Sequence, residues 1–263
     1  MKKEFNKKNK SFANERSDSK KRNEKIVKSS NETLIWGKNS VMDVLNSNLN
    51  ISKIYVNENF TSFKVDKRAI PIEFVSKNIL DEISNGANHQ GYIVAIKSIN
   101  YSDVEQLVKR KPSIILALDH IVDPQNLGAI IRTANAAGIK DILLPKDNAA
   151  EVNSTALKVS SGGFVGMNFY KVSSLSAVLT KLKNNSYWVY STTLQEDSVD
   201  YNTIQYPEHT VLVMGNEGSG VSKGVLAVTD QCIHINQYGT VQSLNVSVAT
   251  GIVVFGYLNS KNR

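Results

Sequence analysis

From residue 113 onward, short continuous apolar runs alternate along the chain with longer stretches of helical periodicity. Apolar runs without polar alternation are typical of strands buried on both faces, and alternating strands and helices are typical of a parallel sheet. Asp123 and Pro124 suit the start of a helix, and Gly138 suits a helix end. The pattern predicts strands at 113–118, 141–145, 188–190, 211–214 and 232–235, with helices at 124–137, 175–184 and 243–258.

Residues 113–263 are therefore expected to form an α/β domain whose mostly parallel sheet carries helices on both faces. Residues 31–98 predict a second, smaller α/β domain, and the polar, charged residues 99–112 between the two predict a linker. In the smaller domain the pattern predicts a helix near 41–45 and strands at 51–56, 70–75 and 91–96.

The positive charge of the chain lies in its first residues. Residues 1–28 hold eleven Lys/Arg and four Asp/Glu, so their net charge of +7 equals that of the whole chain. With few apolar residues to bury, residues 1–30 are predicted to be a basic disordered tail. An arm that binds RNA through counterion release and a solvated extension are both consistent with this composition, and both readings stay open.

Composition also narrows the class of protein. No apolar run reaches the length of a membrane span, and the first twenty residues lack the apolar segment of a secretion signal. Cys232 is the only cysteine, which excludes an intramolecular disulfide and a cysteine-based zinc site. We therefore expect a cytoplasmic protein without a bound metal.

Three polar or glycine-rich segments follow predicted strands, where open α/β sheets bind their ligands. Gly128 and Arg132 share a helix face in the first, three glycines of the second allow close backbone approach, and Ser243 of the third can cap a helix. A solvated arginine, a tight turn and a capping serine would explain each segment alone. A nucleotide-dependent oxidoreductase ranks last, because the glycines lack the dinucleotide-binding spacing. The segments are 126–134, 215–220 and 239–249.

Taken together, the segments resemble the signature motifs of the SpoU, or TrmH, family of RNA ribose methyltransferases. Residues 35–41 and 89–91 further resemble the auxiliary domain of the RlmB-like branch, which modifies a guanosine in 23S ribosomal RNA. One departure is Asn236, where the family commonly has proline. The motifs are Asn126-x-Gly128-x-x-x-Arg132-Thr133-Ala134, Gly215-Asn216-Glu217-Gly218 and Ser243-Leu244-Asn245-Val246-Ser247-Val248-Ala249.

The resemblance implies a SPOUT-type domain with a trefoil knot, a homodimer, S-adenosylmethionine as methyl donor and RNA as substrate, bound with help from residues 31–98. The implied reaction is methyl transfer to a ribose 2′-hydroxyl, foremost that of a 23S ribosomal RNA guanosine. A tRNA methyltransferase and a catalytically silent ribosome-assembly factor are the alternatives. The implied cofactor-binding residues are Gly215, Asn216, Gly218, Ile235, Gly239 and Leu244, and the implied catalytic residues are Arg132, Asn126, Glu217, Ser243 and Asn245.

For Arg132, chemistry favours a clamp on RNA phosphate over a general base, because a guanidinium stays protonated at neutral pH. His120, beside Asp119 at a predicted strand end, is interpreted as a structural residue, since no matched motif requires it.

Overall fold

The computed structural model describes residues 32–47, 49–60, 63, 70–97, 99–216 and 218–261. The predicted basic tail, residues 1–30, lies outside this part of the chain. The chain divides into two compact units with the main boundary between Ser98 and Ile99. None of the helices in the described part is long and apolar enough to span a membrane.

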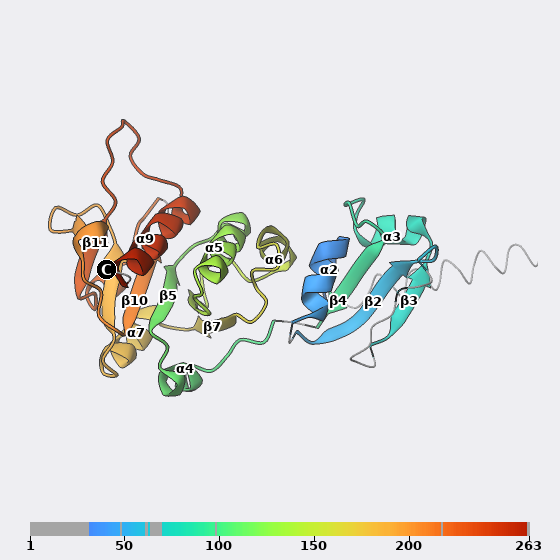
Figure 1. Ribbon diagram of the computed structural model, residues 1–263, viewed down its shortest axis with the longest axis horizontal. Coiled ribbons are helices and arrows are strands. Elements are labelled where there is room, and N and C mark those ends of the chain that lie inside the picture. Colours follow the sequence, from blue (N-terminus) through green and yellow to red (C-terminus); the bar gives the residue numbers. More distant parts are fainter. Residues whose placement is uncertain are drawn as a thin grey trace, which may run out of the picture. The chain divides into compact units, whose positions relative to one another are not determined.

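The first unit is built on a four-stranded mixed sheet with strand order β1-β4-β2-β3, of which Figure 1 labels β4, β2 and β3. Strands β2 and β3 are parallel, whereas β4 runs antiparallel to both β1 and β2. Leu80 of helix α3 packs against Tyr55 and Ile93 in one core cluster, and helix α2 packs against β1 and β4. The elements are β1 Thr33–Trp36, α2 Lys38–Leu45, β2 Ile51–Asn57, β3 Ile72–Val75, α3 Lys77–Ile83 and β4 Tyr92–Ile96.

The helix and three strands predicted for this unit are confirmed, with shifts of one to a few residues at their ends. The prediction missed β1 and α3. Strand β1 has only four residues, of which Ile35 alone is buried, so it carries almost no periodic signal. Helix α3 has Leu80 as its single buried residue, which leaves little of an apolar face to detect.

The second unit contains a seven-stranded sheet with strand order β7-β6-β5-β10-β8-β11-β9. Every neighbouring pair is parallel, which confirms the predicted sheet type. All six residues of β5 and all five of β6 are buried, as their unbroken apolar runs indicate. The strands are β5 Ile114–Asp119, β6 Asp141–Pro145, β7 Asn168–Val172, β8 Trp188–Thr192, β9 Val199–Asp200, β10 Thr210–Gly215 and β11 Gln231–His234.

Helices cover both faces of this sheet, as predicted (Figure 1). Helices α4, α7 and α8 contribute to a large apolar cluster on one face, whereas α5 packs against α6 and α9 on the other. After β11 near one edge, the chain returns to place α9 against α5 and the central strand β10, which is the kind of path that the expected knot requires. The helices are α4 Val104–Arg110, α5 Pro124–Ala136, α6 Ser154–Val159, α7 Leu175–Lys183, α8 Lys223–Leu226 and α9 Val246–Lys261.

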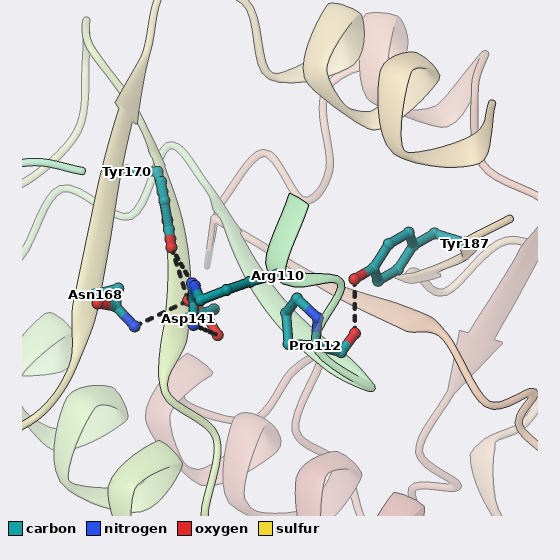
Figure 2. Close-up of polar contacts among 6 residues, drawn as sticks. All are labelled: Arg110, Pro112, Asp141, Asn168, Tyr170 and Tyr187. Carbon is teal, nitrogen blue, oxygen red and sulfur yellow. Dashed lines mark hydrogen bonds and ion pairs between the residues drawn. The ribbon is translucent and has the colours of Figure 1, made fainter. Parts of the chain in front are cut away.

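Residues 99–112, expected to be a linker, instead belong to the second unit and contain helix α4. Leu107 of this helix is fully buried in the apolar cluster. Arg110 lies at its end and donates to the buried Asp141 carboxylate at 2.5 Å (Figure 2). The Tyr187 hydroxyl donates to the Pro112 carbonyl at 2.6 Å and holds the end of the segment. The linker prediction was wrong because the many charged residues of 99–112 gave no sign of the one buried leucine and the one ion pair that attach this stretch to the second unit.

Candidate active site

A cavity of about 410 Å³ opens at the carboxyl ends of the central strands of the seven-stranded sheet. Open parallel sheets bind ligands at this edge, because the loops that leave neighbouring strands meet there. Four segments line the cavity: residues after β8, after β10 and after β11, and the start of α9. These include parts of the second and third segments singled out in the sequence.

Asn216 organises the glycine-rich loop that follows β10. Its backbone pairs with that of Gly220 through hydrogen bonds of 3.0 and 2.8 Å. Its side-chain oxygen accepts from the backbone N–H groups of Gly218 and Ser219, and its amide donates to the His120 carbonyl at 2.8 Å. The donors of Gly218, Ser219 and Gly220 are therefore engaged within the loop, and the glycines shape the cavity wall.

Gly215 and Asp119, at the ends of the neighbouring strands β10 and β5, determine the conformation of the same loop. A Cβ atom on Gly215 would lie 2.4 Å from the Gly220 carbonyl carbon, so only glycine fits where the loop folds back. The Asp119 carboxylate, fully buried at the end of β5, accepts from Ser222 N and from His120 Nδ1, both at 2.6 Å. Thus the end of β5 is tied to the far end of the loop.

Asn245 joins the first and third sequence motifs. Its side-chain oxygen accepts from the backbone N–H groups of Ser247 (2.9 Å) and Val248 (3.4 Å), while its amide donates to Asn126 Oδ1 at 3.0 Å. Asn245 therefore caps α9, which begins at Val246. The expected capping role of Ser243 is wrong: that residue lies outside the first turn and lines the cavity.

The cavity brings together most, but not all, of the predicted residues. Gly239 lies in the exposed loop before α9 and is not among the cavity-lining residues. Glu217 lies outside the described residues. The predicted residues that line the cavity are Gly215, Asn216, Gly218, Ile235, Ser243 and Leu244.

Arg132 and Gly128 lie on α5, away from the cavity lining. Arg132 is exposed and forms no ion pair with an acidic residue in the described part of the chain. A Cβ atom on Gly128 would lie 2.6 Å from the Ala156 carbonyl oxygen, so this glycine allows α5 and α6 to pack closely. Gly128 therefore has a packing role, and the Arg132 guanidinium has no acidic partner among the described residues.

Asn236, the departure from the family pattern, is held by two side chains. Its amide donates to Asp200 at 2.6 Å, and its oxygen lies 3.2 Å from His234 Nε2. Proline has no side-chain amide and could form neither contact, so the tie between this loop and the end of β9 depends on Asn236.

Comparison with known proteins identifies the chain. Residues 113–255 match the SpoU rRNA methylase family, and residues 34–102 match the RNA 2′-O ribose methyltransferase substrate-binding family. The 23S rRNA (guanosine-2′-O-)-methyltransferases RlmB of Haemophilus influenzae and Salmonella typhi are 38% and 35% identical to it, over 71% and 73% of this chain and 77% and 80% of theirs. The chain belongs to the SpoU family.

A structure of an AdoMet-bound rRNA methyltransferase from Sinorhizobium meliloti is also similar, with a TM-score of 0.77, 26% identity and 90% coverage of each chain. This SpoU protein therefore has the SPOUT fold and is an S-adenosylmethionine-dependent RNA 2′-O-ribose methyltransferase, with a substrate-binding domain for RNA at its N-terminal side.

The chemistry of the cavity fits S-adenosylmethionine. Apolar side chains such as Met214 and Leu244 suit an adenine ring, and hydroxyl and amide groups suit the ribose and the amino-acid end. Among its described lining residues none is Asp, Glu, Lys or Arg, and His234 is the only titratable one. A positively charged sulfonium would therefore meet no cationic side chain of lysine or arginine in this lining.

Sequence reasoning missed the lining residues contributed by the end of β8 and the loop after it, and those at the ends of β10 and β11 outside the motifs. The position of that loop after a predicted strand was the available signal, since β8 is a direct neighbour of β10. Its residue types were ordinary for any turn, and the motif pattern did not include them. The missed residues are Thr192, Thr193, Leu194, Met214, Ile233, His234 and Gln237.

Proposed function

We propose that this protein methylates the ribose 2′-hydroxyl of a guanosine in 23S ribosomal RNA. The observation that carries the proposal is the similarity to RlmB methyltransferases along most of their length, which includes the substrate-binding domain. The substrate-binding domain contributes to the choice of RNA. Similarity over both domains therefore supports a shared substrate better than similarity over the catalytic domain alone would.

The side chains at the start of α5 and α9 support a positioning role. The Asn245–Asn126 hydrogen bond fixes the two helix starts relative to each other, and Ser243 stands at the cavity wall beside them. S-adenosylmethionine supplies a methyl group on a positively charged sulfur that is already activated for transfer. The work left for the protein is to hold the ribose hydroxyl in line and to stabilise charge as its proton leaves.

Arg132 is proposed as the clamp on the RNA backbone at the target nucleotide. Its guanidinium is exposed and forms no ion pair with the described acids, so it can bind phosphate in a bidentate manner. Replacing it with lysine keeps the charge and removes the fork. We expect Arg132→Lys to lower the single-turnover methylation rate about 100-fold, with unchanged binding of S-adenosylmethionine. A near-normal rate would rule out the bidentate clamp.

A homodimer is proposed as the working form. Helix α9 is apolar over most of its surface, yet Val248 and Phe255 are 52% and 44% exposed. Exposed apolar side chains on one helix favour association with a second copy. Sedimentation equilibrium should give twice the chain mass, and Phe255→Asp should shift the protein to the monomer. A monomer in the unaltered protein would contradict the proposal.

The decisive experiment maps 2′-O-methyl groups in total RNA from cells with and without the gene. One guanosine of 23S ribosomal RNA should lose its methyl group, and the purified protein with labelled S-adenosylmethionine should restore it. Loss from a tRNA instead would replace the proposed substrate. Binding of S-adenosylmethionine without transfer to any RNA would favour a silent assembly factor.

A further inference from the structure

The substrate-binding domain contains a second pocket, of about 510 Å³. Its volume lies within the roughly 300–1,000 Å³ of small-molecule sites. It is lined by residues at the end of β2, at the start of α3 and in the turn between α3 and β4. No motif of the methyltransferase domain contributes to it. Its polar lining groups are asparagine and glutamine amides, the Lys77 ammonium, the Asp81 carboxylate and the His89 ring, and its aromatic wall is Phe60.

His89 fixes the turn between α3 and β4, which forms one wall of the pocket, by two hydrogen bonds. His89 is buried, and its Nδ1 accepts from the backbone N–H of Gly91 at 2.9 Å. This bond leaves the ring proton on Nε2, which donates to the Asp81 carboxylate on α3 at 3.0 Å. His89 is thus fully engaged between helix and turn, and it shapes the pocket without offering a free nitrogen to a ligand.

Gln90 and Gly91 complete the same wall. The Gln90 side-chain oxygen accepts from the Lys38 backbone N–H at 2.9 Å, which ties the turn to the start of α2. Gly91 has φ +83°, and a Cβ atom there would lie 2.3 Å from the Phe60 ring. In the His-Gln-Gly run, His89 and Gln90 therefore fix the turn, and the absence of a Cβ at Gly91 leaves room for the Phe60 ring.

The pocket presents three kinds of recognition group. Phe60 is 39% exposed and stacks on Tyr92 with ring centroids 5.3 Å apart, so it is a supported aromatic surface. The Asn57 oxygen accepts from the Asn59 backbone N–H, which leaves the Asn57 amide hydrogens for another acceptor. Lys77 is exposed and pairs with no acid in the described part of the chain.

An aromatic ring, amides that can bond a base edge and one free ammonium are the groups that bind unpaired nucleotides in RNA-binding proteins. A duplex would not need such a pocket, because its bases are stacked and paired. We propose that this pocket binds one unpaired nucleotide of the substrate RNA, with the base against Phe60, its edge on the asparagine amides and its phosphate at Lys77. The proposal rests on the proposed RNA substrate, and it does not require methyl transfer.

The test measures binding of the full-length protein to a fluorescent single-stranded RNA 12-mer of mixed sequence. Phe60→Leu removes the aromatic face and keeps an apolar side chain, and it should raise Kd about tenfold. Phe60→Tyr should restore binding. Phe74→Leu is the matched control, because Phe74 is similarly exposed (44%) on β3 and does not line the pocket. It should bind within twofold of the unaltered protein.

Lys77→Ala gives an independent measurement. It should weaken binding about threefold and reduce the salt slope of log Kd by about one, as expected for one lost phosphate contact. Lys97→Ala removes the same charge from an exposed position outside the pocket and should have a smaller effect on both quantities. A competitor duplex of equal length should displace the 12-mer poorly.

Three results would overturn the pocket assignment: equal affinities for the pocket variants and their controls, equal competition by duplex, or equally tight binding of free nucleoside monophosphates. Methylation of total RNA should stay near normal in the control Phe74→Leu, whereas Phe60→Leu should raise the RNA concentration that gives the half-maximal rate. If no RNA is methylated by any form of the protein but Phe60→Leu weakens binding, the proposed function fails and the pocket stands. If methylation is normal and binding is unchanged, the pocket alone fails.

Discussion

Two buried aspartates on neighbouring strands of the large sheet have different surroundings. Asp141 begins β6, at the side of the sheet where the amino ends of the parallel strands lie (the amino edge). Its carboxylate accepts from side chains of Arg110, Asn168 and Tyr170 (Figure 2). Asp119 ends β5 at the carboxyl edge, where it accepts from one side chain, His120, and one backbone N–H, that of Ser222. The Asp141 carboxylate is enclosed by the fold, whereas the Asp119 carboxylate supports a loop of the candidate cofactor cavity.

This difference separates groups that hold the fold from groups that hold the site. At the amino edge, three side chains from α4 and β7 donate to the Asp141 carboxylate, which is only 2% exposed and is therefore closed to a ligand from solution. At the carboxyl edge, the loop that Asp119 holds is itself a wall of the cavity. Substitutions at the two edges should therefore change different quantities, stability at one and binding at the other.

The largest effect is expected for Asp141→Ala. Removing a 2%-exposed carboxylate leaves the donors of Asn168 and Tyr170 without their acceptor and frees α4 at its end. Because Arg110 is half-exposed and can be solvated, we expect a loss of about 3 kcal/mol, at the lower end for a broken buried ion pair. Urea denaturation measures it, and Kd for S-adenosylmethionine should not change. Asp147→Ala, at an exposed position after β6, is the control. A loss equal to that of the control would contradict the role assigned to Asp141.

The next effect in size is expected for Asp119→Ala. Without the acceptor for Ser222 N, the far end of the loop of residues 215–222 loses its bond to β5, and the bond from Asn216 to the His120 carbonyl remains. We expect Kd for S-adenosylmethionine to rise about tenfold, equal to about 1.4 kcal/mol, as measured by isothermal titration. Asp119→Asn keeps a carbonyl oxygen for the same bond and should restore most of the affinity. If Asp119→Ala bound the cofactor normally, the two edges would not differ in function.

Sequence patterns predicted both strands and the ligand-binding loops at the carboxyl edge, but they predicted the polar contacts of neither aspartate. The unbroken apolar runs of β5 and β6 identified buried parallel strands, and the glycine-rich motif marked the carboxyl edge. The partners of Asp141 lie 27 to 31 positions away, and their meeting depends on strand order, which periodicity does not encode. Ser243 and Asn245 show the same limit locally, since both are good capping residues and only the helix start at Val246 decides between them.

A smaller effect is expected on the methylation rate, and it should distinguish the capping residues of two helices, Asn245 and Asn153. Asn245 caps α9 and also bonds Asn126, whereas Asn153 caps α6 through the backbone N–H groups of Thr155 and Ala156. Each alanine substitution should cost about 1 kcal/mol of stability. Asn245→Ala should in addition lower the single-turnover methylation rate, and Asn153→Ala should not. Equal rates in the two variants would make Asn245 a cap and nothing more.

The smallest effect is expected on the free energy of unfolding at alkaline pH, through Tyr170 at the amino edge. Burial, reinforced by the hydrogen bond to Asp141, raises the pKa of the Tyr170 hydroxyl above its ordinary value of 10.0. The folded state thus favours the neutral phenol, and its stabilising contribution is complete below pH 10 and is lost as pH rises above it. Burial also raises the pKa of Tyr190, to about 12, so a residual slope is expected from other tyrosines.

We therefore expect Tyr170→Phe to reduce the decline in unfolding free energy between pH 10 and 11 by at most about 1.4 kcal/mol per pH unit. At pH 8 the variant should be less stable by about 1 kcal/mol, because its hydrogen bond to Asp141 is gone. Tyr238→Phe, at a side chain that is 95% exposed, is the matched control. An unchanged decline in Tyr170→Phe would mean that this phenol ionises in the folded protein, so that the amino edge would be open to solvent and the contrast with the carboxyl edge would be lost.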